Sequence, residues 1–367
     1  MGILQPIWDG TFVYREPVCF STDKDGQPTG GTLLYQPEEI LSVTSFDGSV
    51  FYQPVRDYTA NGRQLVRTEA SRIPYLERSV YCKPFTGVPE TAWVRLSGGK
   101  AYMEVVSDVY RWQTLVTYTH RDKWAGFQPE ACGESLPHSM EKLRAGGDFH
   151  LTLYGDSITA GWEASGCNER AIDMVTLGEY HVSLWHAPYQ PAWAELVTNA
   201  LQARYPQSNV IKTNRAAGGS TVQWGVEHAA ELVPPCKPDL IMLGFGMNSM
   251  QESAEDYRRA ILSIIRTIRK ECHDCEFVLM SPMIPNPEIK GFQNNQLPAQ
   301  QDVLYQIAAE LEGVCIAPVH SVFREMTARG KHYLELTGNC INHPNDFSVR
   351  VYAQTVLRTL GVDGNDG

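Results

Sequence analysis

Hydrophobic and polar positions divide the chain into two parts with different periodicities. Up to residue 146, short alternating stretches are interrupted often by Gly, Pro and Asp, which is typical of β-strands joined by turns. Trp93–Leu96 and Ala101–Val105 flank a Ser-Gly-Gly-Lys turn and predict a hairpin, and Tyr110–Tyr118 is rich in aromatic and β-branched residues. We therefore predict an antiparallel β-sandwich, jelly-roll-like in form, over residues 1–146.

From residue 147 to residue 367, short apolar runs alternate with helical patterns. The predicted strands are Phe149–Tyr154, Asn209–Thr213, Leu240–Phe245, Phe277–Met280 and Val314–Pro318. The predicted helices are Ala192–Tyr205, Val222–Leu232, Ala254–Lys270, Ala299–Leu311 and Phe347–Leu360. Ser253 is placed to cap the third of these helices. This alternation predicts an α/β domain with a mostly parallel sheet, in which ligands bind at the carboxyl ends of the strands.

Charge and hydropathy exclude several kinds of partner. The formal net charge of −11 disfavours attraction to nucleic acid or to an anionic membrane surface, and it suits a small neutral substrate better than a polyanion. No apolar run approaches the roughly 20 residues of a membrane-spanning helix. The first residues lack the pattern of a secretory signal, so we expect a cytoplasmic protein. No sequence feature indicates an oligomeric state.

The nine cysteines are scattered from Cys19 to Cys340, which indicates reduced thiols rather than a disulfide framework. Cys272 and Cys275 have C-x-x-C spacing, but no second pair lies at zinc-finger distance. A His-Glu-x-x-His motif is also absent, so zinc hydrolysis is the weaker reading. We expect neither a metal nor a cofactor.

Polar residues follow the first three predicted strands of the α/β domain. Ser157, in Gly-Asp-Ser, follows the first strand, Gly219 lies in the glycine pair after the second, and Asn248 follows the third. Each segment alone can be an ordinary loop, and Ser157 can simply cap a helix. Together they place a hydroxyl, a backbone N–H and an amide donor at successive strand ends, which are the parts of an oxyanion hole.

The segment before the last helix contains His343 followed by proline. Held in such a turn, the imidazole can act as general base on Ser157 and then as acid to the leaving group. The alternative interpretation is a capping loop, in which Asp346 caps the helix and His343 has no chemical role.

These four segments, in this order, resemble the SGNH/GDSL hydrolase family from roughly Asp148 to Leu360. The resemblance implies a flavodoxin-like parallel sheet flanked by helices, with Ser157 as nucleophile and His343 as base. It also implies three oxyanion donors: Ser157, Gly219 and Asn248. Gly218 is the alternative for the glycine.

Two positions depart from the family pattern. Ser249 follows Asn248, where the family has Asp, and Cys340 stands three residues before His343, where the family has its catalytic acid. A backbone carbonyl that holds the imidazole, giving a Ser–His dyad, is the favoured substitute. The nearby carboxylates of Asp346 and Glu335 are the alternatives.

The order of the two parts also resembles that of bacterial two-domain acetylesterases, which implies an acetylated carbohydrate as substrate. The stretch Ala160–Gln190 has little periodicity, and loops of that length are often functional. It carries Trp162 and Trp185, and Trp224 follows the glycine pair, so these rings are candidates for stacking on a sugar, although most aromatic residues pack in cores.

The leading hypothesis is a serine esterase that removes small acyl groups, acetyl in particular, from a carbohydrate or similar polar alcohol. A lipase or thioesterase acting on longer acyl chains is the alternative among enzymes. The substitution at Cys340 suggests a third possibility, a catalytically decayed carbohydrate-binding protein.

Overall fold

The structure is a computed structural model that describes residues 4–23, 25–78, 109–289 and 292–362. Its centre is a five-stranded sheet in which all neighbouring strands are parallel. In spatial order the strands are β11 (Ser208–Asn214), β8 (Gly147–Gly155), β12 (Leu240–Gly244), β13 (Glu276–Met280) and β14 (Val314–Ala317). Numbered along the chain, this order is the 2-1-3-4-5 of flavodoxin-like sheets, as the resemblance to the SGNH/GDSL family implies.

Side chains of the central strands alternate between two separate hydrophobic cores. In β12, Leu240 and Met242 pack into one core, whereas Ile241 and Leu243 pack into the other, and all four are buried. A strand that is buried on both faces has no polar face, so it appears in the sequence as a continuous apolar run. The sheet is therefore the middle of three layers.

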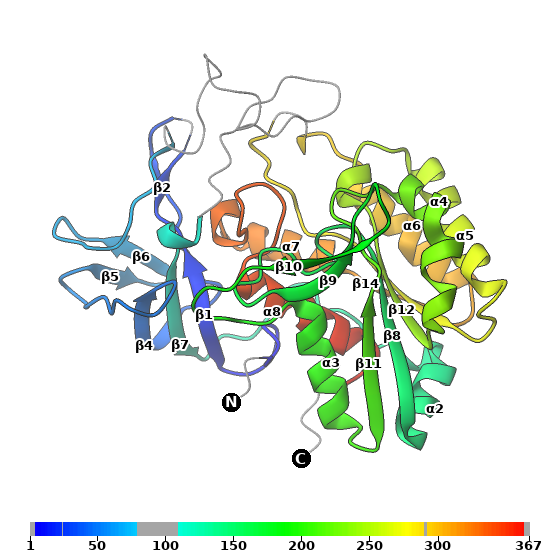
Figure 1. The fold of residues 1–367 in the computed structure, drawn as a ribbon. Coiled ribbons are helices and arrows are strands. Elements are labelled where there is room, and N and C mark those ends of the chain that lie inside the picture. The colour runs from blue at the N-terminus through cyan, green and yellow to red at the C-terminus, as the bar shows by residue number, and fades with distance from the viewer. Residues whose placement is uncertain (1–3, 24, 79–108, 290–291, 363–367) are drawn as a thin grey trace.

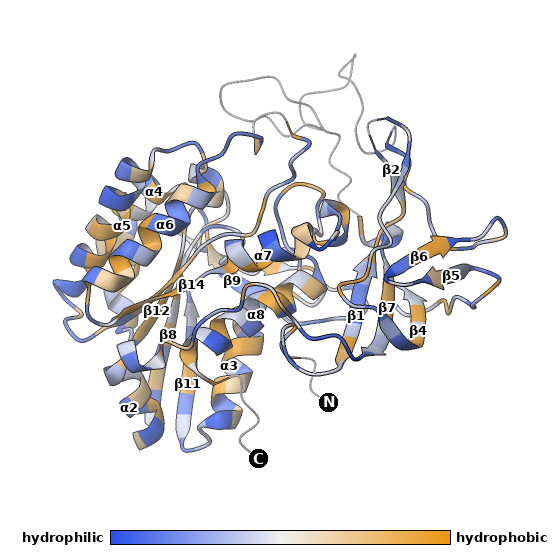
Figure 2. Ribbon diagram, turned by 180° about the vertical axis from the view of Figure 1, so that it is seen from behind, coloured by the Kyte–Doolittle hydropathy of each residue, from blue (hydrophilic) through white to orange (hydrophobic). Residues whose placement is uncertain are grey.

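Helices form the two outer layers (Figure 1). The first core is shared with α2 (Pro137–Ala145), α3 (Trp193–Arg204), α7 (Val319–Ala328) and α8 (Asp346–Leu360). The second is shared with α4 (Val222–Leu232), α5 (Ala254–Arg269) and α6 (Leu297–Glu310). Hydrophobic and hydrophilic segments alternate along these helices, as amphipathic outer layers require (Figure 2).

The predicted cap of α5 is confirmed, because Ser253 Oγ accepts a hydrogen bond from Asp256 N at 3.1 Å. The helices α2 and α7 were not predicted. Across the described ranges, no helix combines the length and the apolar character needed to cross a membrane.

The N-terminal part forms small antiparallel sheets beside the α7 and α8 layer, on the side opposite α4 and α5 (Figure 1). The largest sheet has the order β1 (Phe12–Val18), β7 (Thr114–His120), β4 (Pro37–Ser45). Two short pairs join β2 (Ser21–Thr22) to β3 (Pro28–Thr29) and β5 (Tyr58–Asn61) to β6 (Gln64–Arg67). The stretch predicted as one strand, Tyr110–Tyr118, begins instead with the 3₁₀ helix η2 (Val109–Trp112) and continues as β7. The hairpin predicted at Trp93–Val105 lies outside the described residues.

The two parts share one continuous core, since Val18 and Leu33 belong to the same cluster as Phe323 and Tyr352. A division into domains of residues 1–146 and 147–367 stays a prediction. A fully buried ionic contact joins the parts at Lys331, whose Nζ lies 3.0 Å from Glu16 Oε1 and 3.1 Å from Glu335 Oε2.

The stretch predicted as a loop contains an antiparallel hairpin, β9 (Asn168–Ile172) and β10 (Glu179–Ser183). The N–H of Ile172 donates to the carbonyl of Ala216 at 2.9 Å, which fixes the hairpin beside the chain that follows β11. The hairpin turn therefore lies near the glycine pair, Gly218 and Gly219.

Candidate active site

A tight turn at the carboxyl end of β8 presents Ser157. Asp156 Oδ1 accepts the N–H of Ile158 at 3.0 Å, and the N–H of Trp162 donates to the carbonyl of Ser157 at 3.1 Å. The strand order reverses between β8 and β12, and ligands of open α/β sheets bind at such a point. Ser157 therefore lies at the carboxyl edge of the sheet, where a ligand is expected to bind.

The loop before α8 brings His343 to this serine. Ser157 Oγ and His343 Nε2 are 2.8 Å apart, within hydrogen-bond distance. Asn339 Oδ1 organises the loop, because it accepts the backbone N–H groups of Ile341 at 2.9 Å, Asn342 at 3.0 Å and His343 at 3.1 Å. The side chains that the sequence places 186 positions apart therefore meet.

The other ring nitrogen of His343 faces Glu163. Nδ1 lies 3.5 Å from Glu163 Oε1, and it has no hydrogen-bond partner although it is buried. The sequence reasoning missed Glu163. Glu163 lies only six residues after Ser157, and this short separation could have suggested that it lies near the nucleophile. Its left-handed backbone (φ +70°), however, leaves no signal in the sequence.

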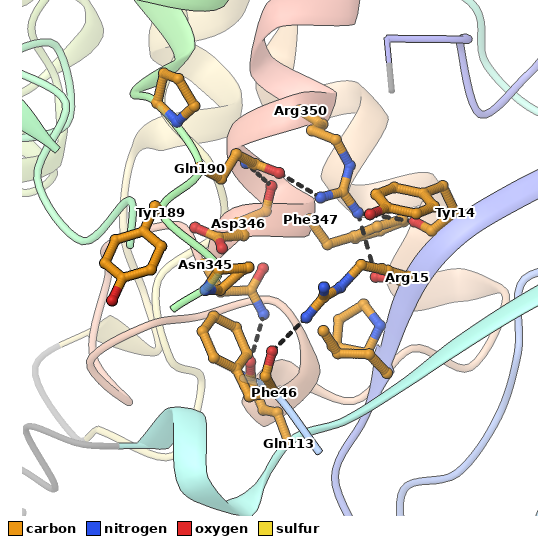
Figure 3. A pocket seen from close by; sticks show the side chains of 14 residues that line it. Tyr14, Arg15, Phe46, Gln113, Tyr189, Gln190, Asn345, Asp346, Phe347 and Arg350 are labelled. Atoms are coloured by element: carbon orange, nitrogen blue, oxygen red, sulfur yellow. Dashed lines mark hydrogen bonds between the residues drawn. The ribbon is translucent and has the colours of Figure 1, made fainter. Parts of the chain in front are cut away.

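Asp346 lies elsewhere in the site. Its two carboxylate oxygens accept from Ser165 N at 2.8 Å and Ser165 Oγ at 2.7 Å, and burial raises its pKa. Figure 3 shows Asp346 beside Gln190, in the cavity between α8 and the N-terminal part. The prediction that Asp346 caps α8 is wrong. Asn345 is the cap, because its Oδ1 accepts Ser348 N at 3.0 Å and the helix begins one residue earlier than expected.

The remaining candidates for the acid are also engaged elsewhere. Glu335 is fully buried beside Lys331, and its Oε1 accepts backbone N–H groups of the N-terminal part. Burial raises the pKa of the Cys340 thiol to about 12, so this thiol is neutral near pH 7. Among the described residues, Glu163 supplies the carboxylate within 4.0 Å of the His343 ring.

The loop that carries the glycine pair is bonded to the end of β8, because Ala217 N and Ser220 Oγ both donate to the carbonyl of Gly155, at 2.9 and 3.1 Å. Gly219 adopts φ +80°, which suits glycine, and a Cβ on Gly218 would lie 2.6 Å from the Trp162 ring. Asn248 is exposed, and its Nδ2 donates to Ser220 O at 3.0 Å, which leaves a second N–H for a ligand. Within the described ranges, neither Ser157 nor Gly219 has its backbone N–H bonded to an acceptor, so both remain available.

Ser249, which departs from the family pattern, has a structural contact. Its Oγ accepts the N–H of Val222 at 2.8 Å, the first residue of α4. The hydroxyl thus fixes the start of α4 close behind the glycine pair.

The three candidate tryptophans have different environments. Trp162 packs edge-on against His343, with ring centroids 5.7 Å apart. Trp224 is buried, and its Nε1 donates to Met174 O at 3.0 Å, which ties the hairpin turn to α4. Trp185 is 64% exposed and lies against the exposed ring of Tyr189.

Asp156 is the titratable group directly behind the nucleophile. Burial raises its pKa to about 6, and this effect is partly offset by the backbone N–H groups of Ile158 and Thr159 and by His343. As for metals, the described part of the chain contains no group of three or more His, Cys, Asp or Glu side chains that could hold an ion.

A flavodoxin-like sheet with a paired hydroxyl and imidazole at its carboxyl edge is the architecture of an SGNH hydrolase. Residues 153–348 match the model of the GDSL-like lipase/acylhydrolase family, which is more than half of the chain. The protein therefore belongs to that family.

Several solved structures have a similar fold. A two-domain esterase active on acetylated mannans (CEX), co-crystallised with mannopentaose, is 19% identical, with a TM-score of 0.47, over 62% of this chain and 53% of that one. The acetylxylan esterase Axe2 of Geobacillus stearothermophilus is 20% identical, with a TM-score of 0.46, over 59% of this chain and 96% of that one. LAE5, an α/β hydrolase from the Lake Arreo metagenome, is 20% identical, with a TM-score of 0.45, over 61% and 100%.

The matched region thus spans about half the length of the mannan esterase. Comparison with curated protein sequences finds no significant match. Similarities at this level do not identify the substrate of this protein.

Proposed function

We propose that the protein is a serine esterase that removes small acyl groups, acetyl in particular, from a carbohydrate or a similar polar alcohol. The observation that supports this most directly is the 2.8 Å contact between Ser157 Oγ and His343 Nε2. A hydroxyl paired with an imidazole is the usual arrangement of an activated serine nucleophile.

In the first half of the reaction, Ser157 Oγ bonds to the ester carbonyl carbon while His343 Nε2 takes its proton. The carbonyl electron pair moves onto oxygen, where the N–H groups of Ser157 and Gly219 and the amide of Asn248 stabilise the charge. The bond to the alcohol oxygen then breaks, and that oxygen receives the proton from Nε2. An acyl-serine and a free alcohol result.

In the second half, water attacks the acyl-serine while Nε2 takes a proton from it. The bond to Oγ breaks, Ser157 regains the proton, and the carboxylic acid leaves. The net reaction consumes one ester and one water and needs no cofactor.

Bulky groups beside the glycine pair favour a short acyl chain over the long chains of a lipase or thioesterase. The Trp162 ring packs on Gly218, and Met174 Sδ lies 4.0 Å from the position of a Cβ on Gly219. On this proposal acetyl esters are hydrolysed well and octanoyl esters poorly. Efficient turnover of the octanoyl ester would favour the alternative.

The alcohol is proposed to be a sugar. The exposed aromatic pair Trp185 and Tyr189, with ring centroids 5.3 Å apart, offers apolar faces of the kind that stack on sugar rings. The net charge of −11 favours a neutral carbohydrate over a polyanionic one.

The central test is Ser157→Ala, assayed with p-nitrophenyl acetate and with an acetylated oligosaccharide. We expect activity to be abolished while the protein stays folded. Ser253→Ala is the matched control, because it removes a serine hydroxyl at the exposed cap of α5 and leaves the site untouched. Retained turnover in Ser157→Ala would refute the proposal. A wild-type protein that binds oligosaccharide but is not labelled by a fluorophosphonate would instead support the decayed binding protein.

A further inference from the structure

The Glu163 turn, the His343 loop and the N-terminal part meet at one point. Gly338, in the His343 loop, marks it, because a Cβ there would lie 2.5 Å from Tyr110 Oη and 3.0 Å from Glu163 Cβ. Tyr110 belongs to η2 of the N-terminal part, and its hydroxyl donates to the backbone carbonyl of Glu163. A residue far from the hydrolase sheet in sequence thus holds the main chain of Glu163.

Glu163 needs such a restraint. Its backbone has φ +70°, a conformation that costs a non-glycine residue energy and persists only where the surroundings fix it. Its side chain is 20% exposed, and its Oε1 lies 3.5 Å from the one ring nitrogen of His343 that lacks a hydrogen-bond partner. Loose contacts of this kind in a free enzyme often shorten when substrate binds.

Gln113, the residue that follows η2, is hydrogen-bonded to the loop that carries His343. Gln113 is fully buried, and its Nε2 donates to the carbonyls of Leu334 and Thr337, both at 2.8 Å. Thr337 Oγ1 in turn donates to the carbonyl of His343 at 2.9 Å. Figure 3 shows Gln113 receiving a hydrogen bond from Asn345, the cap of α8. The short segment that contains Tyr110 and Gln113 therefore contacts both the Glu163 turn and the His343 loop, which lie on either side of the imidazole.

We propose, on the basis of the proposed esterase function, that Glu163 is the acid that orients His343, and that Tyr110 of the N-terminal part positions Glu163. The carboxylate takes the place of the acid that the family has at the position of Cys340. It accepts the Nδ1–H of His343 and stabilises the imidazolium that forms when Nε2 takes the serine proton. The N-terminal β part is then a component of the catalytic centre.

The test uses the full chain and p-nitrophenyl acetate, with kcat and KM measured separately. Glu163→Gln is expected to lower kcat by roughly 10²- to 10⁴-fold, as loss of the acid does in other triads, with little change in KM. Glu163→Asp keeps the charge and is expected to fall between the wild type and Glu163→Gln.

Tyr110→Phe removes only the hydroxyl and is expected to lower kcat by roughly 3- to 30-fold, because slight misplacement of a catalytic group is costly. In the Glu163→Gln background the same change is expected to have no further effect, since Tyr110 acts through Glu163. The matched control is Tyr35→Phe, which also removes a buried hydroxyl that donates to a backbone carbonyl in the N-terminal part, that of Ile7. It is expected to leave kcat unchanged.

The pH profile adds a readout that a purely structural role would not move. Asp156 interacts electrostatically with His343, Tyr110 and Cys167 interact with Glu163, and burial raises the pKa of all three groups. All three remain in Glu163→Gln, so a difference from the wild type reports on Glu163 alone. Without its counter-charge the imidazolium that forms during the reaction is less stable, and the pH dependence of kcat/KM in Glu163→Gln is expected to differ from that of the wild type.

The results of these variants separate the role of Glu163, the role of Tyr110 and the proposed function. If Ser157→Ala is inactive while Glu163→Gln keeps kcat within threefold of the wild type, the proposed function stands and the role of Glu163 is overturned. If Tyr110→Phe lowers kcat equally in both backgrounds, its effect does not pass through Glu163 and that step is overturned. If Ser157→Ala is active, the proposed function itself fails.

Discussion

Asn339 Oδ1 lies 3.1 Å from the backbone nitrogen of His343 and accepts its hydrogen bond. The same oxygen also accepts the N–H groups of Ile341 and Asn342. One side-chain atom therefore sets the conformation of the loop that delivers the imidazole to Ser157.

Replacing Asn339 by Ala removes all three bonds. We expect a loss of roughly 1–3 kcal/mol of stability, because buried N–H groups lose their acceptor. We also expect kcat/KM to fall by about 10- to 100-fold, since the imidazole is no longer held at bonding distance from Ser157. Esterase assays and urea unfolding measure the two effects. Asn339→Asp keeps an acceptor oxygen and should retain most activity; equal losses in both variants would argue against this role for the oxygen.

A second prediction concerns pH and Asp156. Its folded-state pKa of about 6 lies above the ordinary 3.8, so the folded protein keeps a proton that the unfolded chain has lost. The resulting stabilisation is fully present below about pH 4 and is lost as the pH rises through about 6. Asp156→Asn should remove this part of the pH dependence, up to about 3 kcal/mol between pH 4 and pH 7.

Urea unfolding followed by tryptophan fluorescence at several pH values measures the Asp156 effect. Burial also raises the pKa of Asp346, so both proteins keep some dependence of the same sign, and only the difference between them is informative. If the two stability curves run parallel across this range, the Asp156 carboxyl does not titrate as described.

A third prediction concerns the buried ion group between the two parts of the chain. Burial opposes the charge of Lys331, but Glu16 and Glu335 outweigh this effect and raise its pKa. Lys331→Met would leave two buried carboxylates without a counter-charge, and we expect a loss of roughly 3–5 kcal/mol of stability. The control is Lys142→Met, which breaks a partly exposed pair with Asp239 and should cost no more than about 1 kcal/mol. Similar losses in both variants would contradict the special role of the buried group.

The α/β fold could be predicted because its signals are local. The central strand β12 is a short, fully buried apolar run, and α5 carries both a capping serine and a regular apolar face. The unpredicted helices α2 and α7 are short, at 9 and 10 residues, and α2 begins with a proline after a buried leucine. The hairpin β9–β10 was missed because one of its strands, β10, is exposed or half-buried along its length and, among the described strands, pairs with β9 alone.

Ser157, Gly219, Asn248 and His343 could be proposed from the sequence, since each follows or precedes a recognisable element in a characteristic order. Glu163 could not be found in that way. Its approach to His343 depends on a left-handed backbone and on a hydrogen bond from Tyr110, a residue 53 positions away. Neither feature leaves a periodic or compositional trace.

By itself, the sequence determined the parallel sheet, its helical layers and the strand ends at which polar residues gather, because periodicity and turn chemistry act over a few neighbouring residues. Only the tertiary structure decided which carboxylate faces the imidazole, where Asp346 and Glu335 are bound, and how Tyr110 and Gln113 of the N-terminal part contact the loops of the site. Those relationships join residues from distant segments, and packing of the whole chain is what brings them within a few ångströms of one another.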